Sequence, residues 1–169
     1  ETGVGAGETP DSEVLARASH ERSTLALPLL QLREPLAPAV AAERAGAALI
    51  PAELESRVEE LRRAGYTLVI EGAGGVMVPL SWQERGRVGT GPLFYTVLDL
   101  AEACSLDAVI VARAGLGTLN HIALTVQALQ SRQVAVRGVV LNGCGASPGL
   151  AESTNPSVLA RMLPGLRVV

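Results

Sequence analysis

The feature that most constrains the fold is a series of short apolar segments separated by stretches with helical patterning. Residues Thr67–Glu71, Ala108–Ala112 and Val136–Leu141 are mostly apolar, and each is followed by a loop and then a longer helical stretch. Strands that are apolar on both faces are typical of parallel sheets covered by helices. The sequence therefore predicts an α/β fold with a mainly parallel sheet, in which Leu166–Val169 begins a fourth strand.

Helices are predicted before and between these strands. Asp11 or Ser12 is expected to cap a helix that runs to about His20, because a short oxygen acceptor satisfies the free N–H groups of the first turn. Pro51 opens an amphipathic helix that Gly65 ends. The other helices are expected near Pro38–Ala45, Phe94–Cys104, Leu119–Ser131 and Pro156–Met162.

The composition predicts one domain, residues 1–169, with an aliphatic core. Hydrophobic residues make up 48% of the chain and the mean hydropathy is +0.30, which excludes a disordered chain. A net charge of −3, with no basic stripe and few aromatic side chains, argues against nucleic acid as a partner. No apolar run reaches ~18 residues, and no signal peptide is present, so we expect a cytoplasmic protein that does not span a membrane. Cys104 and Cys144 are too few for a disulfide framework or a zinc site.

Candidate binding residues follow the first of these strands. In a parallel α/β sheet, ligands bind beyond the carboxyl ends of the strands. Glu71 lies at such an end and is followed by the small residues Gly72–Gly75. A carboxylate there can hold Mg²⁺ directly or through water, and glycine N–H groups can approach an anion closely. The alternative is a tight turn with a solvated acid.

A second candidate, Gly115–His121, joins the next strand to a helix. Free N–H groups at a helix N-terminus favour a carboxylate or a phosphate. The alternative is an ordinary turn in which Thr118 or Asn120 caps the helix. His121 falls inside the helix, where a packed or hydrogen-bonded histidine is expected rather than a catalytic one. Asn142-Gly143 ends the third strand, where an amide can recognise a purine or can simply form a turn.

The basic residues exclude a phosphate-binding lysine within the chain. All 14 of them are arginines, whereas a P-loop needs a lysine. Two glycine-rich stretches, Gly3–Glu8 and Gly86–Gly91, are superficially similar to a P-loop but lack that lysine. We interpret both stretches as loops.

Six motifs, in order along essentially the whole chain, together resemble the dethiobiotin synthetase family. Each motif is weak or moderate alone, but the order and similar spacing make the set specific. Glu1-Thr2-Gly3 resembles the second half of a KPVETG segment, and Asp11 an acid that opens the next helix. The other four are the Glu-Pro-x-x-Pro stretch Glu34–Pro38, the VEGAGG-like Ile70–Gly75, the GLGTxNH turn Gly115–His121 and the strand end Leu141–Gly143.

The resemblance implies a fold, a reaction and an assembly. The fold is a three-layer, P-loop NTPase-like α/β fold, whose first strand and P-loop would lie outside this chain, and the protein is a homodimer. The reaction joins CO₂ to 7,8-diaminopelargonate with ATP and Mg²⁺ during biotin synthesis. One amine becomes a carbamate, ATP phosphorylates it, and the second amine closes the ring of dethiobiotin.

The resemblance also assigns roles to particular residues. Asp11 and Glu71 resemble Mg²⁺-binding acids, and Thr2 resembles a residue that contacts the diamine. The positions expected to bind ATP are Asp11, Glu71, Gly72, Ala73, Gly74, Asn142 and Gly143. The positions expected to hold the substrate carboxylate, presented across the dimer interface, are Gly117, Thr118, Leu119 and Asn120.

The chain also departs from the family. Both family lysines and the C-terminal loop that closes over adenine fall outside it, and the loop Trp82–Gly91 is longer than expected. We therefore expect a chain truncated at both ends, which holds no catalytic residue and does not transfer phosphoryl groups alone. Two alternatives stay open. One is an amidotransferase-type or partitioning ATPase, against which the Gly115–His121 turn and Thr2 argue. The other is a non-catalytic homologue, of which the absent lysines would be the signature.

Overall fold

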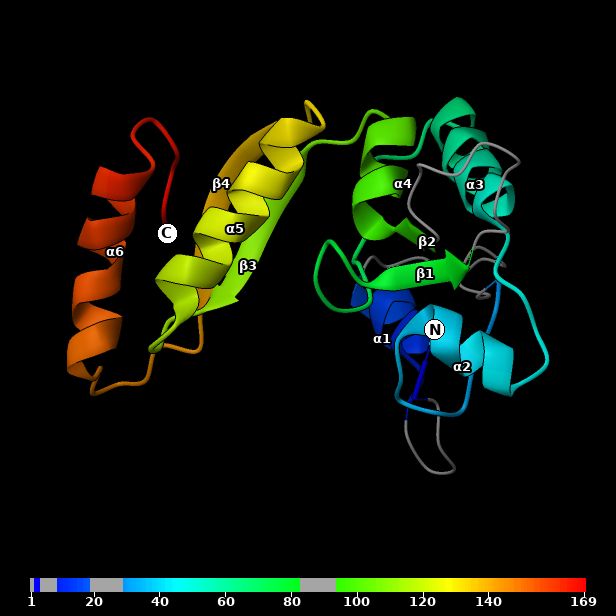
Figure 1. The fold of residues 1–169 in the computed structure, drawn as a ribbon, viewed down its shortest axis with the longest axis horizontal. Coiled ribbons are helices and arrows are strands. Elements are labelled where there is room, and N and C mark those ends of the chain that lie inside the picture. The colour runs from blue at the N-terminus through cyan, green and yellow to red at the C-terminus, as the bar shows by residue number, and fades with distance from the viewer. Residues whose placement is uncertain (1, 4–8, 19–28, 83–93) are drawn as a thin grey trace. The chain divides into compact units, whose positions relative to one another are not determined.

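A computed structural model of the chain describes residues 2–3, 9–18, 29–82 and 94–169 (Figure 1). The chain divides into two compact units, Glu1–Leu100 and Ala101–Val169. The stretch Gly86–Gly91, most of Gly3–Glu8 and most of the Trp82–Gly91 loop lie outside the described residues. No helix within the described ranges is long and apolar enough to cross a bilayer.

The second unit is a strand–helix–strand–helix arrangement, as the sequence predicts. Strands β3 (Ala108–Arg113) and β4 (Val136–Asn142) are parallel, with Ile110 opposite Val139. Parallel neighbours need a crossover connection, which helix α5 (Thr118–Ser131) supplies. Helix α6 (Leu150–Met162) follows β4. The α/β class with a parallel sheet is confirmed.

The predicted fourth strand begins beside β4. Val168 pairs with Val139 in a parallel bridge. The Val139 N–H donates to the Arg167 carbonyl at 2.8 Å, and the Val169 N–H donates to the Val139 carbonyl at 2.9 Å. A Cβ on Gly138 would lie 3.2 Å from the Arg167 carbonyl oxygen, so the small residue permits this close approach.

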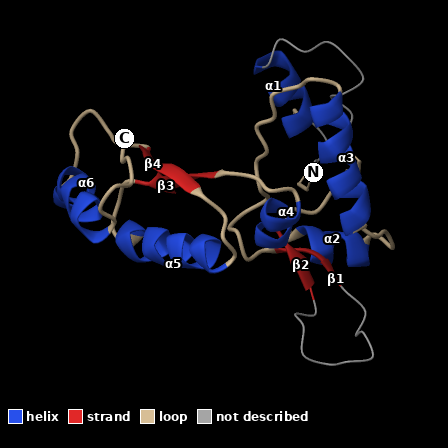
Figure 2. Cartoon of the chain, turned by 90° about the horizontal axis from the view of Figure 1, so that it is seen from above, coloured by secondary structure: helices blue, strands red, loops and turns tan. Residues whose placement is uncertain are grey.

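The core of the second unit lies between the sheet and its two helices. Figure 2 shows α5 and α6 on the same side of β3 and β4. The fully buried side chains there are Ile122, Leu129, Val139 and Leu159. Burying one such side chain contributes roughly 1.5–3 kcal/mol. Within this unit the helices cover one face of the sheet. Val109 and Val111, whose side chains alternate with the buried Ile110, are exposed on the other face.

Helix α6 starts six residues earlier than the sequence predicts. The predicted start was Pro156, because proline favours the first turn of a helix. The observed start is Leu150, and the Glu152 carboxylate accepts a hydrogen bond from the Gly149 N–H at 2.8 Å, which caps that end. Pro156 therefore lies inside the helix, where a proline typically costs about 3 kcal/mol.

The first unit contains helices before a short antiparallel pair of strands. Helix α3 begins at Pro51, as predicted, and the chain turns away at Gly65, whose φ is +85°. The predicted helix after Asp11 is confirmed as far as Ala18. In order, its elements are α1 (Asp11–Ala18), α2 (Pro38–Arg44), α3 (Pro51–Arg63), β1 (Pro79–Trp82) and β2 (Phe94–Thr96). Helix α4 (Val97–Ala103) follows β2, and its last three residues belong to the second unit.

The predicted strand Thr67–Glu71 is wrong for this structure. The segment forms no strand, and its central Val69 is 97% exposed. A strand that is apolar on both faces forms only when neighbouring strands bond its backbone, and none of the described strands pairs with it.

The predicted helix Phe94–Cys104 begins three residues late. Its first residues instead form β2, which pairs with β1 in antiparallel fashion. Thr96 and Asp99 set the helix start: the Thr96 N–H donates to the Asp99 carboxylate at 2.8 Å, and the Asp99 N–H donates to the Thr96 hydroxyl at 3.2 Å. This reciprocal cap resembles the pairing that typically opens a helix.

Candidate functional site

The turn after β3 brings two of the predicted site segments together. The Ala114 N–H donates to the Asn142 carbonyl at 3.1 Å, which ties the turn to the end of β4. Gly117 has φ +90°, a conformation that glycine adopts without steric cost, and α5 begins at the next residue. The segments Gly115–His121 and Asn142-Gly143 therefore share the carboxyl edge of the β3–β4 sheet.

Asn155 in α6 holds the same turn, a role that the sequence did not reveal. Its side-chain nitrogen donates to the Ala114 carbonyl at 2.7 Å and to the Gly115 carbonyl at 3.1 Å. The side chain is buried. An amide donor that satisfies two turn carbonyls fixes the conformation of that turn, because buried carbonyls left without a partner are costly. The sequence analysis placed Asn155 just before the helix expected near Pro156–Met162, and therefore outside that helix.

The first turn of α5 has free hydrogen-bond donors. The Thr118 N–H donates to the Gly115 carbonyl at 3.4 Å and the His121 N–H to the Gly117 carbonyl at 3.3 Å. Among the described residues, the N–H groups of Leu119 and Asn120 have no such acceptor, and no side chain caps the helix. The alternative of a turn capped by Thr118 or Asn120 is therefore wrong. The exposed N–H groups and the helix dipole favour an anion at this end.

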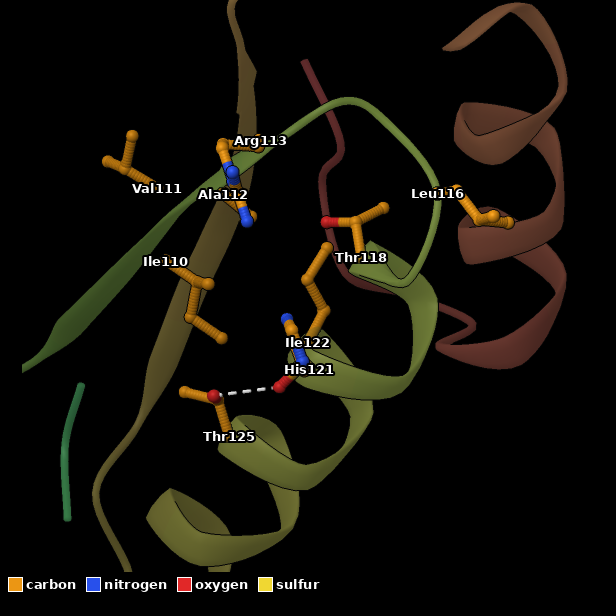
Figure 3. A pocket seen from close by; sticks show the side chains of 9 residues that line it. All are labelled: Ile110, Val111, Ala112, Arg113, Leu116, Thr118, His121, Ile122 and Thr125. Carbon is orange, nitrogen blue, oxygen red and sulfur yellow. Dashed lines mark hydrogen bonds between the residues drawn. The ribbon is translucent and has the colours of Figure 1, made fainter. Parts of the chain in front are cut away.

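A cavity of about 270 Å³ lies between β3 and α5 (Figure 3). One wall is β3 and the other is the first two turns of α5. Its polar side chains include Arg113, Thr118 and His121. The lining residues are Ile110, Val111, Ala112, Arg113, Leu116, Thr118, His121, Ile122 and Thr125.

Asn142 uses part of its hydrogen-bonding capacity locally. Its side-chain oxygen accepts a hydrogen bond from the Gly143 N–H at 2.9 Å, and Gly143 has φ +79°. This is the geometry of the turn that the sequence offered as an alternative. The side-chain NH₂ group is still a donor, so recognition of adenine by Asn142 stays a prediction.

In the first unit, Glu71 is exposed and precedes a compact turn. A Cβ on Gly72 would lie 2.9 Å from Val97 Cγ1, and one on Gly74 would lie 2.9 Å from Val78 Cγ2. Gly74 also has φ +84°, so the turn requires glycine at both positions. The turn is therefore a tight one, and its glycines let the backbone approach its neighbours closely.

The segments Thr2-Gly3 and Glu34-Pro35, two of the motifs, are in contact. The Gly3 N–H donates to the Glu34 carbonyl at 3.2 Å, and a Cβ on Gly3 would lie 3.3 Å from Pro35 Cβ. Arg44 binds the Glu34 carboxylate through two hydrogen bonds of 2.7 and 2.8 Å. These hydrogen bonds lower the pKa of Glu34 and raise the pKa of Arg44. The structure thus places Thr2 beside the Glu-Pro-x-x-Pro stretch.

The carboxylate oxygens of Asp11 and Glu71 are suitable ligands for Mg²⁺. Both carboxylates are exposed, and neither bonds to another described residue. Mg²⁺ binds one or two protein carboxylates and completes its coordination with water and phosphate oxygens. Within the described part of the chain, no group of three or more His, Cys, Asp or Glu side chains could hold a metal ion. Any Mg²⁺ held here would therefore rely on few protein ligands.

Comparison with known proteins gives a consistent result. A family described as an AAA domain matches residues 2–165. The chain is 40% identical over 157 residues to the ATP-dependent dethiobiotin synthetase BioD of Anaeromyxobacter sp. (strain K), covering 92% of this chain and 66% of that protein. It is 38% identical over 165 residues to the protein of the same name from Mycobacterium marinum, covering 97% and 67%. The Mycolicibacterium gilvum protein is 42% identical over 137 residues, covering 80% and 56%. The chain thus spans about two thirds of the length of the first relative, or 66%.

Proposed function

The chain belongs to the AAA domain family and to the dethiobiotin synthetase family, and we propose that the protein containing it is a ligase that makes dethiobiotin from 7,8-diaminopelargonate, CO₂ and ATP. The observation that carries the proposal is 40% identity over 157 residues to a protein named for this activity. The relatives' names favour this function over an amidotransferase-type or partitioning ATPase.

The described residues support a division of tasks. Asp11 and Glu71 would hold Mg²⁺, which neutralises negative charge on the phosphates of ATP. The glycine turn after Glu71 and the Asn142 side chain would contact the nucleotide, and Thr2 would contact the diamine. The free N–H groups of Leu119 and Asn120 would bind the substrate carboxylate. We also infer a cytoplasmic location, supported by the free thiols of Cys104 and Cys144.

The proposal is tested by assaying the full-length protein for dethiobiotin and phosphate. Product should form only when diamine, CO₂, ATP and Mg²⁺ are all present. Glu71→Gln removes a charge and keeps the shape, so turnover should fall by roughly 100-fold or more, as for loss of a major electrostatic element. Glu53→Gln, at another exposed glutamate, is the matched control and should leave turnover unchanged. Nucleotide binding without any turnover would instead favour a non-catalytic homologue.

We further propose that the protein is a homodimer whose subunits share each site. The Glu71 turn of one subunit would serve the amines, and the Gly117–Asn120 turn of the partner subunit would hold the carboxylate. A two-fold arrangement then gives two equivalent shared sites. Mixing inactive Glu71→Gln and Gly117→Trp subunits should restore part of the activity, because one site of each mixed dimer would have both intact halves. No recovery from dimers that demonstrably exchange subunits would contradict the shared site.

A further inference from the structure

Two consecutive residues at the start of α4 contact both ends of the turn that follows Glu71. At the far end of the turn, the Leu98 N–H donates to the Val76 carbonyl at 3.0 Å. At the near end, a Cβ on Gly72 would lie 2.9 Å from Val97 Cγ1 and 3.0 Å from Val97 Cγ2. The start of α4 therefore determines where this turn lies.

The start of α4 is itself held in place by hydrogen bonds. Helix α4 follows β2 without a break (Figure 1). The Asp99 carboxylate accepts hydrogen bonds from the Thr96 N–H at 2.8 Å and from the Thr96 hydroxyl at 2.6 Å. Hydrogen bonds to an ionised carboxylate are stronger than those between neutral groups. Thr96 is also only 2% exposed and lies opposite Pro79 in the β1–β2 register. The next residue, Val97, consequently has a defined position.

The contact with Val97 reaches Glu71 through one peptide bond. Neighbouring Cα atoms are about 3.8 Å apart across a trans peptide, so a shift of Gly72 also moves Glu71. The Glu71 side chain is exposed and bonds to no other described residue, so no side-chain partner compensates for such a shift. Mg²⁺ demands near-ideal geometry at roughly 2.0–2.1 Å from its oxygen ligands. Displacing the Glu71 backbone by a few tenths of an ångström should therefore weaken metal binding.

We propose that Val97 is a positioning residue for the metal site. Its two methyl groups set the position of Gly72 and, through Gly72, that of the Glu71 carboxylate that would bind Mg²⁺. This inference rests on the proposed function, in which Glu71 holds Mg²⁺, and extends it to a hydrophobic side chain of α4. Changes at the contact between Gly72 and Val97 should alter metal affinity even where the fold is kept.

The test measures binding of Mn²⁺ to the full-length protein by electron paramagnetic resonance. Mn²⁺ takes the oxygen ligands that Mg²⁺ takes, and ATP is present without diamine so that no turnover occurs. Gly72→Ala places a methyl group against Val97, so the turn must shift. Because a misplacement of roughly 1 Å can cost about 100-fold, this smaller shift should weaken Mn²⁺ binding by about 10-fold. Glu71→Gln should weaken it at least as much.

A double variant tests the contact directly. Val97→Ala alone removes two methyl groups and should weaken Mn²⁺ binding by about 3-fold, less than Gly72→Ala, because the turn keeps its hydrogen bond to Leu98. When both changes are combined, the new methyl group faces the Cβ of residue 97 at 3.5 Å, an ordinary contact. Independent effects would multiply to about 30-fold. The proposal instead predicts that the double variant binds Mn²⁺ within about 3-fold of the wild-type protein, because contacting residues are not additive.

Val58→Ala is the matched control for a loss of stability alone. Val58 lies in α3, outside the turn, and is 7% exposed. Its truncation should lower the urea midpoint and leave Mn²⁺ affinity unchanged. If Gly72→Ala does not fold, Val97→Ala is compared with Val97→Ile, which keeps both Cγ atoms and should bind Mn²⁺ as the wild-type protein does. The proposal is overturned if the double variant binds no better than Gly72→Ala, or if Mn²⁺ affinity follows stability in every variant.

Metal binding is measured without turnover, so this inference and the proposed function can fail separately. If the wild-type protein makes no dethiobiotin but the double variant regains Mn²⁺ affinity, the proposed reaction fails and the positioning role of Val97 stands. If dethiobiotin is made while Gly72→Ala and Val97→Ala bind Mn²⁺ as the wild-type protein does, the reaction stands and the positioning role fails. Unchanged Mn²⁺ binding by Glu71→Gln would overturn the role of Val97 as well, because Glu71 would then not hold the metal.

Discussion

The two units treat similar apolar segments in opposite ways. In the second unit, Val139 is fully buried in a strand that is bonded on both sides, to β3 and to the segment at Val168. In the first unit, Val69 lies in an equally apolar segment, yet it is 97% exposed and outside any strand. The difference shows that apolar residues alone do not make a segment a buried strand. The segment also needs neighbouring strands that form hydrogen bonds with its backbone.

The helical connection between β3 and β4 explains why the apolar segments of the second unit form paired strands. Strands β3 and β4 are joined by α5, which packs on both of them. One continuous segment therefore contains two paired strands and the helix that covers them. Thr67–Ile70 has no such partner among the strands that the structure describes. Its backbone groups are left to solvent, where an apolar strand gains nothing from forming.

The largest expected effect comes from removing a core side chain in the second unit. Leu159→Ala truncates a fully buried residue of α6 and should lower the free energy of unfolding by about 2–5 kcal/mol, because it loses apolar burial and leaves a cavity. Val69→Ala, the matched change in the first unit, should stay within about 0.5 kcal/mol. Urea unfolding of the full-length protein measures both. A large loss from Val69→Ala would show that this segment is buried in solution.

An intermediate effect is expected at Asn155, which joins α6 to the turn after β3. Asn155→Ala removes two hydrogen bonds and leaves two carbonyls unsatisfied. The free energy of unfolding should therefore fall by about 1–3 kcal/mol. Asn155→Asp keeps the shape but cannot donate, and should cost at least as much. Urea unfolding measures the stability, and hydrogen exchange at Gly115–Thr118 reports on the turn. Unchanged exchange in both variants would contradict the role of Asn155.

The smallest effect is expected from an exposed ion pair in the first unit. The hydrogen bonds from Arg44 lower the pKa of Glu34. A lowered pKa in the folded state means that the pair stabilises the fold above the ordinary pKa of glutamate, and that this contribution is lost as the pH falls through the lowered value. Arg44→Gln should raise the pKa of Glu34 toward its ordinary value in an NMR titration. About 1 M salt should reduce the difference in the pKa of Glu34 between the two proteins, because salt screens the attraction between the two charges. An identical titration in the variant would contradict the pairing.

The sequence predicted best where neighbours in the chain are also neighbours in space. The strands and crossover helix of the second unit follow from local apolar patterning, so their bounds agree with prediction within one residue. Thr96 and Asp99 are spaced as a helix cap, and that local signal would have placed the start of α4 at Val97. The three-residue strand β2 is too short for a pattern of alternating residues to reveal.

Parts of the candidate site could not be predicted in the same way. Asn155 was missed because its partners, Ala114 and Gly115, lie about 40 residues away in the chain. The free donors at the start of α5 were predicted, since Gly115 and Gly117 mark a turn before a helix.

The hydrogen bonds from Asn155 also determine how fast the turn can move. An unrestrained loop rearranges in roughly nanoseconds to microseconds. The turn after β3 is instead held by a buried amide of α6, so it can open only when that helix detaches locally. Such local unfolding takes roughly microseconds to seconds. Ligand exchange at the neighbouring cavity is therefore expected to follow the slow timescale of helix detachment, and the bound lifetime of a ligand should lengthen or shorten with the stability of α6.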